Sequence, residues 1–179
     1  VHRGSESDVL SRYYEAARAH AAELVVRITS DCPLLDPELL AQMLAAFGEY
    51  RRSDPPVDYL SNTLRRTYPR GLDLELFTFS ALEQAMREAA APSEREHVTP
   101  FIYRHPERFN LRSFERATDI SPLRWTLDTS EDWQLIHAVF ETLGPRGEFF
   151  STEQVLELMQ RRPELAELNA NVEQKKLGG

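Results

Sequence analysis

The chain has 179 residues, 41% of them hydrophobic and 28% charged, which is typical of one soluble globular domain with its own core. Its 21 lysines and arginines against 29 aspartates and glutamates give a formal net charge of −8, which argues against nucleic-acid binding through a general basic surface. A single cysteine, Cys32, excludes an internal disulfide and favours a reducing, cytoplasmic setting, and no apolar run reaches the ~20 residues of a membrane helix.

The first third of the chain alternates helix and strand signals. Apolar residues at helical spacing predict an amphipathic helix over about 6–22, and the β-branched run 24–29 predicts a buried strand. Asp36 followed by Pro37 is typical of a helix N-cap with proline at the first helical position. Beyond a polar loop, residues 57–61 predict a second strand.

The middle of the chain begins with a basic, irregular segment, 65–71, and the alternation of apolar and acidic residues over 72–77 then predicts a half-exposed strand. A further strand is predicted over 109–114, after a helix that stops near residues 105–106. Three serines stand at capping-box spacing from a Glu or Gln and predict helix starts: Ser80 with Glu83, Ser93 with Glu96, and Ser151 with Gln154.

The last third opens with a predicted strand over 123–127, followed by a helix from Ser130 to the stop signal at 144–145. A short helix opens at Pro163, and residues 172–179 are expected to form a flexible tail. No internal repeat or interdomain linker interrupts this order, so the pattern favours a single α/β domain over the whole chain.

Two acidic turns, far apart in the chain, are its most informative feature. Asp31 follows the predicted strand 24–29 and Asp128 follows the predicted strand 123–127, so both are expected at carboxyl ends of strands, where open α/β sheets bind ligands. Paired carboxylates facing phosphates are a usual way to hold Mg²⁺. The alternative is that each aspartate only caps a turn or a helix, because aspartate is common in both places.

Other candidate residues carry weaker signals. Arg65, Arg66 and Arg70 could bind an acidic or phosphorylated substrate through forked hydrogen bonds, or form a solvated basic loop. His97, in the first turn of a predicted helix, is a candidate general base, with packing or capping as the favoured alternative. Cys32 is interpreted as a small buried side chain and not as a nucleophile. The sequence has no Walker-type loop, GxGxxG pattern or Cys/His metal box.

Five segments in collinear order resemble the SpsF-type cytidylyltransferases, the spore coat polysaccharide biosynthesis proteins that are related to acylneuraminate and 3-deoxy-manno-octulosonate cytidylyltransferases. They are VHRGSESDVLS at 1–11, SDCPLLDP at 30–37, RTYPRGLDLE at 66–75, REHVTP at 95–100 and LRWTLDTSED at 123–132. Together they span nearly the whole chain, which makes the resemblance specific at the level of the family.

The resemblance implies a Rossmann-like nucleotidyltransferase sheet with flanking helices, and an enzyme that joins CTP to an acidic sugar and releases pyrophosphate. It implies that Asp31 and Asp128 are catalytic and hold Mg²⁺, and that Gly4 and Ser5 lie beside the nucleotide base. A Mg²⁺ ion would neutralise charge on the phosphates as the sugar oxygen attacks the α-phosphate. Arg70 is expected to bind the sugar acid, on its charge more than on a motif match.

The chain departs from the family pattern at its start. Family members begin with a strand and a loop, containing glycine and arginine, that cradles the triphosphate; that first βαβ portion would precede Val1. The chain is therefore expected to be N-terminally truncated and to show little or no turnover by itself. Two alternatives remain open: a non-catalytic binding or scaffold module of a glycan-assembly pathway, and a sugar nucleotidyltransferase that uses UTP or GTP. Relatives tend to be dimers, and Phe101, Tyr103 and Phe109 are candidates for a homodimer interface, with core packing as the favoured interpretation.

Overall fold

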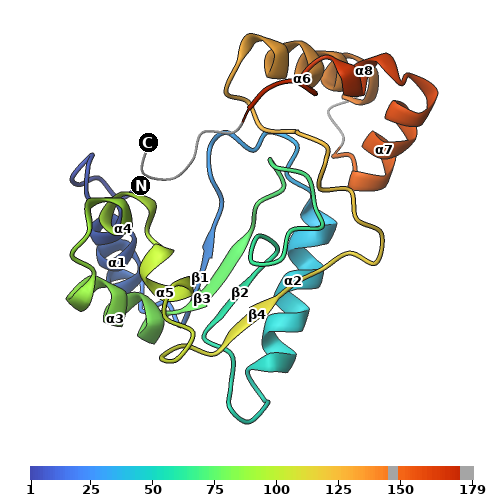
Figure 1. Ribbon diagram of the computed structural model, residues 1–179. Coiled ribbons are helices and arrows are strands. Elements are labelled where there is room, and N and C mark those ends of the chain that lie inside the picture. The colour runs from blue at the N-terminus through green and yellow to red at the C-terminus, as the bar shows by residue number, and fades with distance from the viewer. Residues whose placement is uncertain (145–148, 174–179) are drawn as a thin grey trace.

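The computed structural model describes residues 1–144 and 149–173 (Figure 1). Among them no helix combines the length and the apolar composition that a membrane crossing needs. Most of the tail predicted over 172–179 lies outside the described residues. The elements are, in chain order, α1 (Val9–Ala19), β1 (Leu24–Arg27), α2 (Pro37–Tyr50), β2 (Tyr59–Ser61), β3 (Glu75–Thr78), α3 (Phe79–Glu88), α4 (Pro92–His97), α5 (Pro100–Tyr103), β4 (Leu111–Ser113), α6 (Ser130–Leu143), α7 (Thr152–Arg161) and α8 (Glu164–Glu167).

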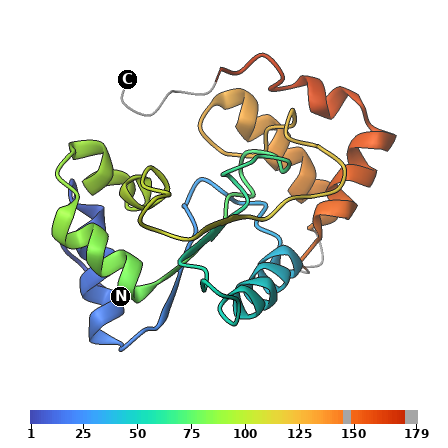
Figure 2. The ribbon, with the colours of Figure 1, turned by 60° about the horizontal axis from the view of Figure 1, so that its bottom comes forward.

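A mixed four-stranded sheet in the order β1-β3-β2-β4 forms the middle of the fold. Strand β3 runs antiparallel to β1 and β2, whereas β2 and β4 are parallel. Helix α2 covers one face of the sheet, and α1, α3, α4 and α5 gather on the other (Figures 1 and 2). The predicted α/β class with flanking helices is thus confirmed, with a mixed sheet.

The two faces of the sheet bury two separate hydrophobic cores. Leu60 and Leu76 point toward α2 and the helices α6 and α7, while their neighbours Tyr59 and Phe77 point toward α1 and α3. This division follows from the alternation of side chains along a strand. Because helices cover both faces, β3 is buried along its whole length, and the half-exposed strand predicted over 72–77 is wrong.

Glu75, on β3, shows how that burial is compensated. The residue is 6% exposed, and its carboxylate accepts hydrogen bonds from the hydroxyls of Tyr59 at 2.6 Å and Thr99 at 2.5 Å. It also pairs with Arg27, which faces it directly in the β1–β3 register. A carboxylate can be buried at tolerable cost when it is paired and hydrogen-bonded in this way.

The strand predicted over 123–127 is also wrong, since this segment forms only one isolated bridge, between Arg124 and Arg70. The N–H of Trp125 donates to the carbonyl oxygen of Arg70 at 2.6 Å, and the ladder ends there. The physical reason is Gly71, whose φ of +100° turns the chain away from strand geometry. The second acidic turn therefore follows a single bridge and not a strand.

Replacing Gly71 by alanine is expected to destabilise the fold by about 3 kcal/mol or more. An added Cβ would lie 2.3 Å from the backbone C and O atoms of Trp125, and the positive φ disfavours any other residue. Gly48→Ala is the matched control, because a Cβ at that helical position meets nothing within 4 Å and improves helix propensity. Urea unfolding of both variants checks this; equal stability of Gly71→Ala and wild type would contradict it.

Two of the three predicted capping boxes are displaced. Thr78, and not Ser80, is the N-cap of α3, and its hydroxyl accepts the N–H of Ala81 at 3.1 Å. Helix α4 begins at Pro92, one residue before the predicted Ser93, and the single helix expected there is divided into α4 and α5. The third box, which opens α7, is confirmed.

The mid-chain aromatic residues belong to the core. Phe101 and Phe109 are buried and pack edge to face, with ring centroids 6.1 Å apart. Tyr103 is partly buried against the same core. The favoured interpretation as core residues is confirmed, and these rings do not form an exposed patch for a dimer.

Candidate active site

Hydrogen bonds join the loop after β1 to the loop before α6. The N–H of Leu127 donates to the carbonyl oxygen of Asp31 at 2.9 Å. The hydroxyl of Thr126 lies 3.0 Å from the same oxygen and 3.2 Å from Oδ2 of the Asp31 carboxylate. Asp128 is the next residue after Leu127, so the fold brings the two acidic turns side by side.

Neither aspartate caps a helix, which was one part of the alternative interpretation. Helix α2 is capped by Asp36, whose carboxylate accepts the N–H of Glu38 at 2.8 Å. Helix α6 is capped by Thr129. Among the described residues, the Asp31 carboxylate accepts no backbone N–H, and the Asp128 side chain, 43% exposed, accepts from a guanidinium. Both carboxylates therefore have lone pairs that local capping does not use.

Asp132, which the sequence interpretation missed as a functional residue, is the buried centre of the second turn. Its carboxylate is fully buried and accepts Nε and Nη2 of Arg124 at 2.9 and 2.8 Å and Nδ2 of Asn169 at 2.8 Å. The backbone N–H groups of Asp128 and Thr129 donate to it at 3.1 Å each. Burial raises the pKa of Asp132, but the hydrogen bonds from Arg124 and Asn169 outweigh it and hold this pKa below its usual range.

The same network positions Asp128. Nη2 of Arg124 bonds Oδ2 of Asp128 at 2.9 Å while the guanidinium also holds Asp132. In the sequence, the Arg124–Asp128–Asp132 network is indicated only by the Thr129-x-x-Asp132 spacing, which is that of a capping box. It predicted the helix start but not the contacts to Arg124 and Asn169.

The donor set at the two turns fits Mg²⁺. This ion prefers oxygen ligands and is usually held in nucleotide sites by one or two carboxylates together with phosphates and waters. Asp31 and Asp128 supply two carboxylates, and the described residues contain no group of three or more side chains that could ligate a metal. Two carboxylates could hold such an ion only together with other ligands, such as phosphate oxygens and waters.

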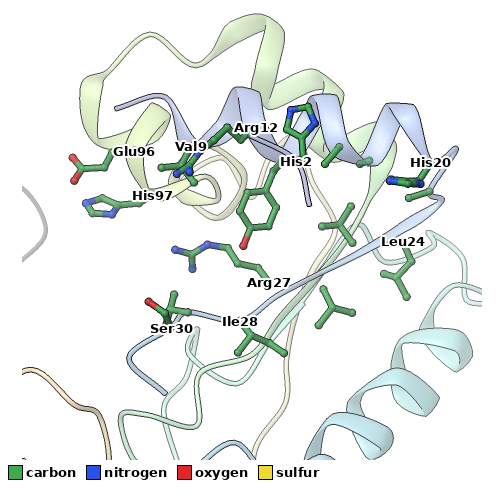
Figure 3. A pocket seen from close by; sticks show the side chains of 17 residues that line it. His2, Val9, Arg12, His20, Leu24, Arg27, Ile28, Ser30, Glu96 and His97 are labelled. Atoms are coloured by element: carbon green, nitrogen blue, oxygen red, sulfur yellow. The ribbon is translucent and has the colours of Figure 1, made fainter. Parts of the chain in front are cut away.

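An open groove of about 810 Å³ runs along α1 and β1 toward the first acidic turn (Figure 3). Its volume falls within the range of small-molecule sites. Ser30, which directly precedes Asp31, lines the groove together with the basic side chains of Arg12, Arg27 and His97. Arg27 is already paired with Glu75, and the acidic side chain of Glu96 also lines the groove, so the lining carries both signs of charge.

Gly4 and Ser5, the residues expected beside the nucleotide base, are not part of the groove lining. Gly4 and Ser5 are exposed in the segment before α1 and do not line it, whereas His2 of the same segment does. His97 lines the groove but is the last residue of α4, so its predicted place in the first turn of a helix is wrong. Among the described residues, the His97 side chain has no hydrogen bond or ion pair that would orient it as a general base.

The three arginines of the segment 65–71 have different environments and do not form one basic cluster. Arg65 is exposed and pairs with Glu115 at 3.4 Å. Arg66 makes a bidentate pair with Asp73, at 2.6 and 2.9 Å. Arg70 is partly buried, and its guanidinium has no hydrogen bond or ion pair with any residue in the described ranges.

Cys32 is buried, 7% exposed, as expected for a small core side chain. Burial raises the pKa of its thiol to about 11. We therefore expect native protein to react very slowly with a disulfide reagent such as Ellman's reagent at about pH 8, and to react stoichiometrically once unfolded in urea. Rapid labelling of the native protein would contradict this.

Comparisons with known proteins agree with this arrangement. The chain matches a family model described as cytidylyltransferase over residues 1–176. It is 34% identical over 180 residues to the uncharacterized protein MJ1063 of Methanocaldococcus jannaschii, covering 98% of this chain and 69% of that protein. It is 31% identical over 169 residues to the spore coat polysaccharide biosynthesis protein SpsF of Bacillus subtilis, covering 93% and 67%.

A solved structure has the same fold. A cytidylyltransferase from Leptospira borgpetersenii superposes with a TM-score of 0.85 at 31% identity, over 97% of this chain and 70% of that one. The chain belongs to the cytidylyltransferase family.

Proposed function

We propose that this chain carries the metal-binding and acceptor-binding part of an enzyme that transfers CMP from CTP to an acidic sugar in surface polysaccharide synthesis. The hydrogen bonds from Thr126 and Leu127 to Asp31 carry the proposal, because they bring Asp31 and Asp128 to one place. Family membership supports the nucleotide. The name of the Bacillus subtilis relative, a spore coat polysaccharide biosynthesis protein, supports a role of the activated sugar in glycan synthesis.

The reaction would form a bond from an acceptor oxygen to the α-phosphorus of CTP and break the bond to the leaving pyrophosphate. When bound, Mg²⁺ would neutralise the charge on the phosphates. Asp31 and Asp128 would hold it, Thr126 orienting the first carboxylate through its hydroxyl and Arg124 fixing the second. The groove that ends at Ser30 would take the nucleotide.

The 179 residues span 67–70% of the length of the relatives they match, and transfer is proposed for a protein with the full length of those relatives. From the chain alone we expect metal binding with little or no turnover. The test is pyrophosphate release by the full-length protein with CTP, Mg²⁺ and several nonulosonic acids, with UTP and GTP in parallel. We expect release that requires CTP and stops with EDTA. Equal rates with UTP or GTP, or no release with any acid, would overturn the proposal.

A further inference from the structure

A strained turn separates helices α4 and α5. Val98 has φ +73° and ψ −56°, and the N–H of Thr99 donates to the carbonyl oxygen of His97 at 2.9 Å. These values define the γ-turn with positive φ, which is rare and strained, and a β-branched residue is especially unfavourable at its centre. Such strain persists only where the surrounding structure enforces it, and it is concentrated at functional sites.

Contacts on both sides hold this γ-turn in place. The side chain of Val98 is fully buried in the core that α1 and α3 share. Before the turn, Arg95 of α4 forms an ion pair with Asp8. After it, the hydroxyl of Thr99, a residue only 2% exposed, donates to the carboxylate of Glu75 at 2.5 Å. Packing and polar contacts together therefore fix the strained conformation.

The turn places His97 at one end of the groove along β1. His97, Ser30 and His20 all line the groove, and Figure 3 shows the first two toward one end and His20 toward the other. Because Ser30 directly precedes Asp31, the end with His97 is the one nearest the first acidic turn. Among the described residues, the His97 side chain makes no hydrogen bond or ion pair, so its ring nitrogens are available to a ligand.

Glu75 links the γ-turn to a second residue of the groove. Its carboxylate accepts the hydroxyl of Thr99 and also pairs with Arg27, which lines the groove. Glu96 adds a negative charge to the same lining. An anionic ligand must overcome that charge, so the placement of the donors on His97 and Arg27 decides how strongly it binds.

We propose that Val98, Thr99 and Glu75 are positioning residues, which through the γ-turn hold His97 against a phosphate group of the nucleotide in the groove. The proposal rests on the proposed function only for the identity of the ligand as a nucleotide. Thr99 acts through His97, because its own buried hydroxyl is already bonded to Glu75. The competing interpretation is that the turn stabilises the fold and has no effect on binding.

The test is a double-mutant cycle on CTP binding by the full-length protein, measured by titration calorimetry with Mg²⁺ and without an acceptor. The variants are His97→Ala, Thr99→Val, which removes the hydroxyl at nearly constant shape, their combination, and Thr99→Ser, which keeps the hydroxyl. Thr152→Val is the matched control for stability, because the buried Thr152 hydroxyl donates to the carboxylate of Asp36 at 2.7 Å and does not line the groove. His20→Ala is the control for a histidine at the other end of the groove.

We expect His97→Ala and Thr99→Val each to weaken CTP binding by about tenfold, and the double variant to bind no more weakly than either, because Thr99 acts through His97. Thr99→Ser, Thr152→Val and His20→Ala should bind CTP like wild type, although urea unfolding should show Thr152→Val and Thr99→Val to be destabilised to a similar extent.

Wild-type affinity of Thr99→Val, equal weakening by Thr152→Val, losses that add in the double variant, or no binding of CTP to wild type would overturn the proposal. Wild-type affinity of His97→Ala would overturn it even if Thr99→Val did not fold. Because transfer is not measured, these outcomes are separate from the pyrophosphate assay that tests the proposed function.

Discussion

Replacing either Asp31 or Asp128 by asparagine in the full-length protein is expected to lower Mg²⁺-dependent CMP transfer by about 10³-fold or more. Asparagine keeps the shape of the side chain but removes the negative charge that would hold the ion. Metal assistance is worth several kcal/mol of transition-state stabilisation, and each 1.4 kcal/mol is a factor of ten in rate. Steady-state pyrophosphate release with CTP and the acceptor measures the effect.

Glu131→Gln is the matched control for these two variants. It removes one negative charge three residues from Asp128, but the Glu131 side chain is exposed in the first turn of α6. We expect its rate to stay close to that of wild type. Near-normal activity of Asp31→Asn or Asp128→Asn would leave that aspartate with a structural role in its turn.

The second large effect concerns stability. Replacing Asp132 by alanine is expected to destabilise the fold by about 3–5 kcal/mol, because it removes two hydrogen-bond acceptors of a buried guanidinium and the acceptor of two backbone N–H groups. Urea unfolding measures the loss. Asp128→Asn is the comparison, and its cost should be far smaller because that carboxylate is 43% exposed. Equal stability of Asp132→Ala and wild type would contradict the role of the network.

The same residue gives the fold an acid-sensitive component. The pKa of Asp132 lies below the ordinary value of 3.8 in the folded state, so the stability it contributes is present above that value. It is lost as pH falls through the lowered folded-state pKa. Wild type should therefore lose stability below about pH 4, and Asp132→Ala should show a shallower dependence over that range. Identical slopes would contradict the assignment.

Some local signals in the sequence predicted local structure. The Asp36-Pro37 pair indicated the start of α2, and the β-branched run indicated β1, because a cap and a strand depend on neighbouring residues. The burial of Glu75 could not be predicted in this way. Its partners Tyr59 and Thr99 lie 16 and 24 residues away in the chain, and an alternating pattern does not reveal that helices cover both faces of a sheet.

In the candidate site too, residues marked by local sequence features could be predicted, and residues defined by distant partners could not. Asp31 and Asp128 could be found because each follows a hydrophobic run, even though only the first run is a strand. Asp132 was missed because Asn169, 37 residues further along, is needed to see its network. Nor does spacing distinguish Arg70 from Arg66: the difference is that Asp73 pairs with Arg66, whereas the Arg70 guanidinium has no hydrogen bond or ion pair with a described residue.

Asp31 and Asp128 are proposed to hold one ion between them. Electron paramagnetic resonance of Mn²⁺ titrated into the full-length protein with CTP tests it most directly, with Asp31→Asn, Asp128→Asn and the double variant compared. We expect each single variant to lose the tight Mn²⁺ site and the double variant to bind no more weakly than either, because one shared ion is lost in all three. Wild-type Mn²⁺ affinity in either single variant, or losses that add in the double variant, would contradict a shared site.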